Sequence, residues 1–210
     1  MFALEVGRII RMGEIWVIES LRGLRIGCAM TGSFCTFRKV FEVWRALKAA
    51  GAELIPIMSF NACSVDTRFY PACEAVGTFE EIAGRKVIAS LNQAEPIGPK
   101  KLLDLLVVAP CTGNSLAKIA AGITDTPATL SVKSHLRNGR PVLIAVSTND
   151  GLGQSAKNIG ALLPVKNVFF VPFGQDDPIE KPNSLVAKFD LIPEAALQAL
   201  NGRQIQPVLR

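Results

Sequence analysis

The sequence contains few of the residues that build metal centres, disulfides and nucleic-acid surfaces. Its single histidine and five cysteines include no CxxC pair and no metal-ligand spacing, so we expect no metal. An odd number of cysteines without an export signal favours reduced thiols in a cytoplasmic protein. Lysine and arginine run no longer than pairs such as Lys100-Lys101, so the net charge of +5 predicts no nucleic-acid partner.

Long apolar runs and the common nucleotide motifs are absent as well. Charged residues interrupt residues 1–20, and no segment reaches the roughly 18 apolar residues of a membrane span, so we expect no membrane association. The chain has neither GxGxxG nor a P-loop, which disfavours a dinucleotide-binding domain and an ATPase. With only His135 available, a Ser-His-Asp triad is disfavoured too.

The composition that remains is typical of one compact α/β domain. Of the 210 residues, 49% are apolar and 20% are charged. We expect residues 1–22 to be an N-terminal extension, either an added hairpin or strand or an upstream start that adds little. Residues 23–210 are expected to form a single domain with an inserted loop region near 60–100 and a C-terminal helix. The mild positive charge favours an anionic substrate.

Apolar strands alternate with amphipathic helices along this domain. Strands are predicted at 24–30, 52–58, 102–109, 141–146 and 167–171. Helices are predicted at 37–50, 127–137 and 152–163, and Ser184 is expected to cap a last helix that reaches Leu200. This alternation predicts a doubly wound, Rossmann-like or flavodoxin-like parallel sheet of about six strands in three αβα layers. Ligands bind such sheets at the carboxyl ends of the strands.

Small polar residues follow three of these predicted strands. Pro110-Cys111-Thr112-Gly113-Asn114-Ser115 and Thr31-Gly32-Ser33 each stand before a helix, where hydroxyls and unpaired N–H groups suit a phosphorylated ligand. The alternative for both turns is simple helix capping. Ser147-Thr148-Asn149-Asp150 follows a third strand, and the Asn149 amide suits a planar ligand unless it is only a turn residue.

Charged residues add a second group of candidates. Arg68, Lys181 and Asn183 suit the carboxylates of a substrate, although surface arginines and capped loops are common. We interpret Asp176-Asp177 as a solvated turn, and His135 as a structural or exposed residue near a helix end. Cys111 is expected to be a packing residue, because no histidine or cysteine lies near it in sequence.

Together these motifs resemble the cysteine-decarboxylase-like flavoproteins. That family has a Gly-Ser turn after its first strand, a Pro-x-x-x-Asn-[Thr/Ser] turn before an Ala-Lys-Ile-Ala-x-Gly-x-x-Asp helix pair, and an Asn at a later strand end. The resemblance implies an FMN cofactor, with the phosphate near Ser33, Ser59 and Ser115 and the ring near Thr112, Asn114 and Asn149. It also implies a homo-oligomer. The implied cofactor-binding residues are Thr31, Gly32, Ser33, Ser59, Pro110, Thr112, Asn114, Ser115, Ser147, Thr148 and Asn149.

Further segments resemble the B-subunit branch of dipicolinate synthases within this family, over residues 23–209. These segments include 94–100, 173–178 and 181–184. The resemblance implies a role in oxidising a dihydrodipicolinate-level precursor to dipicolinic acid in the mother cell of a sporulating bacterium. It also implies a partner, the A subunit of the synthase, which carries NADP or NAD. No residue is assigned to catalysis.

The sequence departs from the decarboxylases in two places, and this leaves rival functions open. Thr148 stands where those enzymes have Met, and no histidine follows the second strand. One rival is an FMN-dependent decarboxylase or prenyltransferase of the same superfamily. The other is a non-catalytic partner protein.

Overall fold

The structure is a computed structural model that describes residues 9–12, 15–18 and 21–210. Strands β1 (Ile9–Met12) and β2 (Ile15–Ile18) pair antiparallel in a small two-stranded sheet of their own. Residues 1–8, 13–14 and 19–20 of the expected extension lie outside the described residues.

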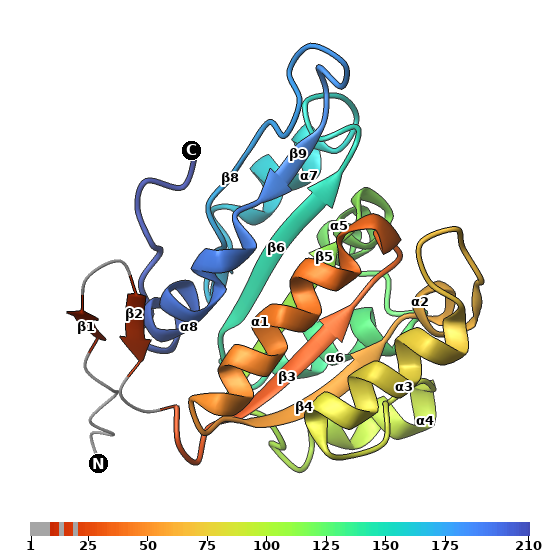
Figure 1. Ribbon diagram of the computed structural model, residues 1–210, viewed down its shortest axis with the longest axis vertical. Helices are drawn as coiled ribbons and strands as arrows, with labels where there is room; N and C mark the ends of the chain where they lie inside the picture. Colours follow the sequence, from red (N-terminus) through yellow and green to blue (C-terminus); the bar gives the residue numbers. More distant parts are fainter. Residues whose placement is uncertain (1–8, 13–14, 19–20) are drawn as a thin grey trace.

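Within the described residues the main sheet has seven strands, and it confirms the expected doubly wound α/β fold (Figure 1). Its parallel part runs β4-β3-β5-β6-β7, the order of a flavodoxin-like sheet. Two short strands extend it antiparallel beyond β6, so the sheet is mixed at one edge. The strands are β3 (Arg25–Met30), β4 (Glu53–Met58), β5 (Leu105–Cys111), β6 (Val142–Thr148), β7 (Val168–Phe170), β8 (Phe173–Gly174) and β9 (Leu185–Ala187).

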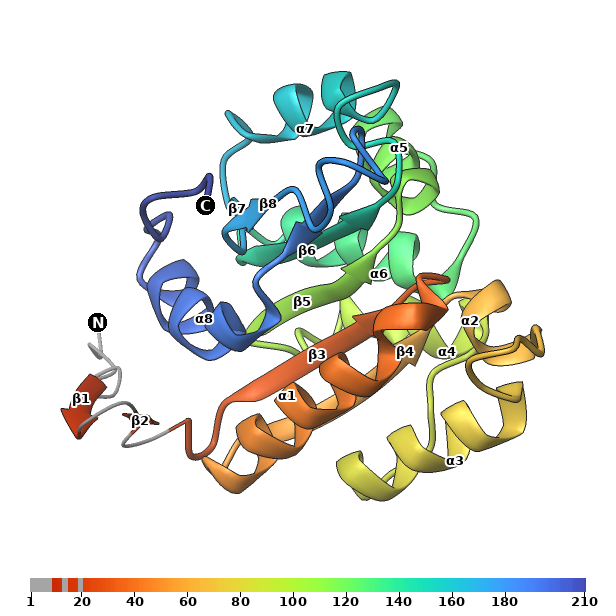
Figure 2. The same ribbon diagram turned by 45° about the horizontal axis from the view of Figure 1, so that its top comes forward.

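Helices cover both faces of this sheet. Helices α1 and α8 pack together on one face, and α4, α5, α6 and α7 form a connected group on the other (Figure 2). All seven residues of β5 are buried, because a central strand of a doubly covered sheet has no wet face. The helices are α1 (Phe37–Ala49), α2 (Phe60–Ser64), α3 (Ala72–Ala83), α4 (Leu91–Ala94), α5 (Gly113–Ala121), α6 (Pro127–Leu136), α7 (Ala156–Leu162) and α8 (Ile192–Leu200). Within the described residues, no helix is both long and apolar enough to cross a membrane.

The expectation that Ser184 caps the last helix was wrong. Residues after Ser184 form β9, and α8 begins only at Ile192, after a short 3-10 turn, η3 (Phe189–Leu191). The reason is the length of β7, which pairs only with β6 residues 142–144. The carboxyl end of β6 therefore lacks a neighbour on that side, and β9 pairs there with Ser147 and Thr148.

The region near 60–100 is also more regular than its sequence predicts. Ser59 does not open a loop: its Oγ accepts the Ala62 N–H and caps α2. Helix α3 starts at Ala72 and ends at Ala83, inside the expected loop region. Residues 91–94 of the same region are helical, since Ser90 and Gln93 form a capping box at the start of α4.

Candidate functional site

The carboxyl ends of β3, β5 and β6 meet at one edge of the sheet. The buried Thr31 joins two of them, because its Oγ1 donates to the Pro110 carbonyl at 2.8 Å and accepts the Thr112 N–H at 2.9 Å. Thr31 and Pro110 therefore hold the two turns in place rather than face a ligand.

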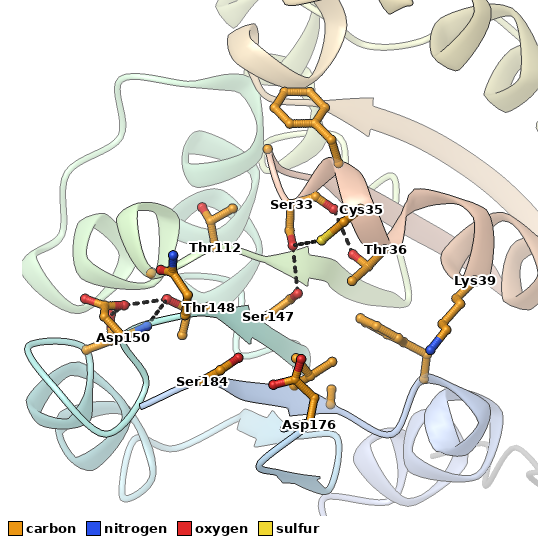
Figure 3. Close-up of a pocket in the computed structure, with 18 of the residues that line it drawn as sticks. Ser33, Cys35, Thr36, Lys39, Thr112, Ser147, Thr148, Asp150, Asp176 and Ser184 are labelled. Atoms are coloured by element: carbon orange, nitrogen blue, oxygen red, sulfur yellow. Dashed lines mark hydrogen bonds between the residues drawn. The ribbon is translucent and has the colours of Figure 1, made fainter. Parts of the chain in front are cut away.

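A groove of about 1830 Å³ opens along this edge (Figure 3). This is larger than the roughly 300–1,000 Å³ of ordinary small-molecule pockets, so it has room for more than one ligand. Nine of the predicted site residues line it: Gly32, Ser33, Arg68, Thr112, Asn114, Ser147, Thr148, Asn149 and Lys181. Among the other predicted residues, Ser59 and Ser115 are buried, Asn183 is exposed, and none of them belongs to its lining.

Ser33 and Ser147 meet in the middle of the groove. Their hydroxyl oxygens lie 2.7 Å apart, and each side chain comes from a different strand end (Figure 3). One hydrogen bond between two hydroxyls uses one proton, and the second proton competes only with a long contact of 4.0 Å between Ser33 Oγ and Cys35 Sγ, so it is available to a ligand. The pair is therefore a donor that faces the groove.

The N-terminus of α5 contributes main-chain donors. Thr112 Oγ1 accepts the Ser115 N–H at 3.2 Å and donates to Ser115 Oγ at 3.1 Å, so Thr112 and Ser115 cap this helix together. The N–H groups of Gly113 and Asn114 have no intrahelical acceptor, because the first turn of a helix never provides one. These amides and the exposed Asn114 side chain are available to an anion.

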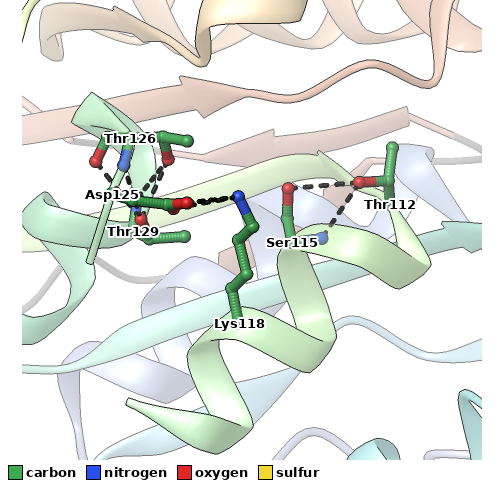
Figure 4. A network of polar contacts seen from close by, with 6 residues as sticks. All are labelled: Thr112, Ser115, Lys118, Asp125, Thr126 and Thr129. Atoms are coloured by element: carbon green, nitrogen blue, oxygen red, sulfur yellow. Dashed lines mark hydrogen bonds and ion pairs between the residues drawn. The ribbon is translucent and has the colours of Figure 1, made fainter. Parts of the chain in front are cut away.

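A charge pair holds α5 and α6 together behind this turn. Lys118 Nζ contacts both carboxylate oxygens of Asp125, at 2.9 and 2.7 Å (Figure 4). Asp125 stands directly before Thr126, which forms a capping box with Thr129 at the start of α6. The Lys-Ile-Ala-x-Gly-x-x-Asp motif thus has a structural reason, since it ties the end of one helix to the start of the next.

Asp150 follows β6 and lies against the start of α5. Its Oδ1 accepts hydrogen bonds from Thr148 Oγ1 and from Ser155 Oγ, the latter at 2.8 Å. These bonds hold the pKa of the Asp150 carboxyl below its usual range, because they stabilise the ionised form. The Thr148 proton is thereby engaged, so Thr148 offers a ligand only an acceptor oxygen.

The three residues predicted to bind substrate differ in the contacts that they already make. Lys181 Nζ lies 3.3 Å from Asp176, and Asn183 uses its carbonyl to accept the Leu152 N–H. Burial acts to raise the pKa of Asp176, but hydrogen bonds from Ser184 and Lys181 outweigh it and the pKa falls. Arg68 lies over the Phe69 ring at 4.8 Å and has no carboxylate partner within the described residues.

Sequence reasoning missed three cations of the groove and one thiol. Lys39, Lys157 and Lys188 line it without an ion pair to any described residue, and the exposed Cys35 lines it beside Ser33. The sequence gives no signal for these residues, because each is one surface residue of an amphipathic or loop segment.

His135 and Cys111 take no part in the groove. His135 is buried, not exposed near a solvated helix end, because α6 packs its last turn into the protein. Burial and the positive charge of Arg140 lower its pKa to about 4. Burial raises the pKa of the Cys111 thiol to about 12, in keeping with the packing role expected for it.

Comparisons with known proteins agree with this fold. The sequence model of the Flavoprotein family matches residues 17–187. The chain is 47% identical over 192 residues to the dipicolinate synthase B subunit of Bacillus subtilis (strain 168), covering 91% of this chain and 96% of that protein. The crystal structure of the dipicolinate synthase B subunit from Bacillus halodurans C is similar with a TM-score of 0.84 and 42% identity, over 91% of this chain and 98% of that one.

An FMN-dependent cysteine decarboxylase is a more distant neighbour. It has a TM-score of 0.63 and 21% identity, over 87% of this chain and 99% of that one. At this identity the likeness extends to the fold alone.

Proposed function

The chain belongs to the Flavoprotein family, and on that premise we propose that it binds FMN and acts as the B subunit of a dipicolinate synthase. The near full-length match to a dipicolinate synthase B subunit carries this proposal. The enzyme oxidises a dihydrodipicolinate-level precursor to dipicolinic acid, in the cytoplasm of a sporulating mother cell. Its partner is the A subunit of the synthase, which holds NADP or NAD.

The donors of the groove fit FMN. A phosphate, a polyhydroxyl chain and a ring with carbonyl groups need hydroxyl and amide partners, and the Ser33–Ser147 pair, Asn114 and Asn149 supply them. The free N–H groups at the start of α5 suit the phosphate. FMN, when bound, supplies a two-electron acceptor for a hydride.

Several cations line the groove. Arg68, Lys39, Lys157 and Lys188 line it without carboxylate partners among the described residues, and an arginine binds a carboxylate through two parallel hydrogen bonds. Lys181 contributes when its pairing with Asp176 is exchanged for a substrate carboxylate. These cations suit a dicarboxylate, and the chain's own part in the reaction is to bind and orient it.

Oligomerisation belongs to the same proposal. We expect copies of this chain to assemble with the flavin enclosed between protomers. Size-exclusion chromatography with light scattering tests this expectation, and a monomer at micromolar concentration in the presence of FMN would contradict it.

Reconstitution tests the function itself. Purified chain is combined with the A subunit of a dipicolinate synthase, the dihydro precursor and each redox cofactor, and the absorbance of the aromatic product is followed. The proposal expects product only with both proteins present and a yellow chain that takes up FMN. Carbon dioxide release from a phosphopantothenoylcysteine-type substrate would instead assign a decarboxylase. A colourless chain that stimulates the A subunit without binding FMN would assign a non-catalytic partner.

A further inference from the structure

Phe69 is an exposed aromatic ring inside the groove. Among the described phenylalanines, only Phe60 and Phe69 are exposed, at 42% and 48%, and of these two only Phe69 lines the groove. Residues 65–71, the segment that carries Phe69, connect α2 to α3 at the edge of the sheet where the groove opens (Figure 1). The ring is therefore available to a ligand that lies in the groove.

Thr67 fixes the conformation of this segment. Its N–H donates to the Tyr70 carbonyl at 3.0 Å, and its Oγ1 accepts the Phe69 and Tyr70 N–H groups at 3.3 and 3.2 Å. Asp66 Oδ1 accepts the Ala72 N–H at 2.7 Å and so ties the segment to the start of α3. Hydrogen bonds from short polar side chains to nearby main-chain groups stabilise turns. The position of Phe69 is thus set by its own turn before a ligand binds.

Tyr70 anchors the same turn in the core. The centroid of its ring lies 6.3 Å from that of Phe37 and 5.9 Å from that of Phe41, and both phenylalanines are buried. Aromatic pairs at these distances attract each other beyond the effect of apolar burial. The turn therefore directs Tyr70 into the core and leaves Phe69, its neighbour in sequence, in the groove.

Arg68 lies over the Phe69 ring. Its Cζ is 4.8 Å from the ring centroid, a cation–π contact, and both residues line the groove. Arg68 has no carboxylate partner within the described residues, so its N–H groups are available to an anion. In a pyridine dicarboxylate each carboxylate is bonded directly to the ring. A carboxylate held by Arg68 therefore brings the ring of the ligand next to Phe69.

We propose, building on the function proposed above, that Phe69 is a specificity-determining residue that stacks on the ring of the pyridine dicarboxylate while Arg68 holds one of its carboxylates. Offset stacking of two aromatic rings adds to the ordinary effect of apolar burial. A dihydropyridine carries tetrahedral carbons that hinder face-to-face contact, whereas the pyridine is flat. The contact therefore favours the oxidised, planar ring over its precursor and over saturated dicarboxylates.

Two dianions that differ in their ring test this role. Dipicolinate and cis-cyclohexane-1,3-dicarboxylate hold their carboxylates at the same relative ring positions, but only dipicolinate has a π face. Isothermal titration measures the Kd of the full-length chain for each in saturating FMN, and the ratio of the two Kd values is the selectivity for the aromatic ring. Phe69→Leu removes the ring and keeps an apolar side chain, whereas Phe69→Tyr keeps the ring. Phe60→Leu is the matched control, because it removes a similarly exposed ring outside the groove lining.

We expect Phe69→Leu to lower this selectivity about threefold to tenfold, the effect of one lost aromatic pair, and Phe69→Tyr and Phe60→Leu to stay within about twofold of the wild-type chain. Unchanged selectivity in Phe69→Leu, or an equal loss in Phe60→Leu, overturns the role of Phe69 alone. A fall in FMN affinity or a change of oligomeric state in Phe69→Leu overturns it too, because the ring would then serve the flavin or an interface between copies. Failure of the wild-type chain to bind either dicarboxylate, with the A subunit present or absent, overturns the proposed function as well.

Discussion

The hydroxyl oxygens of Ser33 and Ser147 lie 2.7 Å apart, although 114 residues separate them in the chain. Each follows or ends a parallel strand, and strands β3 and β6 are not neighbours, since β5 lies between them. The contact therefore spans the edge of the sheet above β5, and it brings two turns into one binding surface.

Removing both hydroxyls should weaken FMN binding more than removing one. After Ser33→Ala or Ser147→Ala the remaining hydroxyl keeps its proton for the ligand, so we expect the Kd for FMN to rise less than about threefold. The double variant removes this donor and should raise the Kd about fivefold to tenfold, the effect of about one hydrogen bond. Quenching of flavin fluorescence on titration measures all three, and a double variant that binds no worse than either single variant would contradict the shared role.

Adding a methyl group at Gly113 should destabilise the protein. The new Cβ would overlap Ser155 Oγ and Thr148 Oγ1, so we expect Gly113→Ala to cost about 1–3 kcal/mol of unfolding free energy. Gly160→Ala is the control, since Gly160 is exposed on α7 with no atom within 4 Å of its Cβ position and should stabilise by about 0.5–1 kcal/mol. Urea denaturation compares them, and equal effects would refute the close packing at Gly113.

FMN should protect one cysteine from alkylation and not another. Cys35 and Cys73 are both exposed, but only Cys35 lines the groove. We expect bound FMN to slow maleimide labelling of Cys35 at least several-fold and to leave Cys73 unchanged. Peptide mass spectrometry of briefly labelled protein reads both sites in one sample. Unprotected Cys35 at saturating FMN would move the cofactor away from this part of the groove.

Arg68 should bind a substrate carboxylate. We expect Arg68→Gln to raise the Kd for dipicolinate about tenfold or more, because it removes a charge-assisted hydrogen bond. Arg38→Gln removes an equal charge from an exposed position outside the groove lining and should change this Kd less than about twofold. Calorimetry at two ionic strengths distinguishes the direct contact from long-range attraction, which salt screens. An equal loss of dipicolinate affinity in both variants would show that Arg68 acts only through long-range attraction.

His135 should make the protein less stable in mild acid. Its pKa is about 4 in the folded chain against 6.5 for the free side chain, so only the unfolded chain binds a proton between these values. Unfolding free energy should therefore fall as pH drops from about 6.5 towards 4, by about 3 kcal/mol in total. His135→Gln removes the chain's single histidine and should flatten this part of the profile. An unchanged profile would refute the assignment.

The fold was predictable because its main signals are local. Apolar runs of strand length and helices with a 3.6-residue period stand clearly in the sequence, and they identify β3, α1, β4 and β6 within a few residues. The misassigned segment after Ser184 had no such signal. Three residues become β9 only because β7 leaves the end of β6 unpaired, and that unpaired edge exists only in the assembled sheet.

The candidate site divides in the same way. Residue types and their place after strands were enough to direct attention to Gly32, Asn114 and Asn149 at a common edge, since parallel strands end on one side. Which polar atoms remain available could not be derived from the sequence. In the sequence, Thr31, Thr112 and Thr148 look like hydroxyl donors that could serve a ligand. In the structure each hydroxyl already donates its proton to another residue, either far along the chain or across a turn. Local patterns thus determine where chains turn, whereas long-range hydrogen bonds and packing decide which groups a ligand meets.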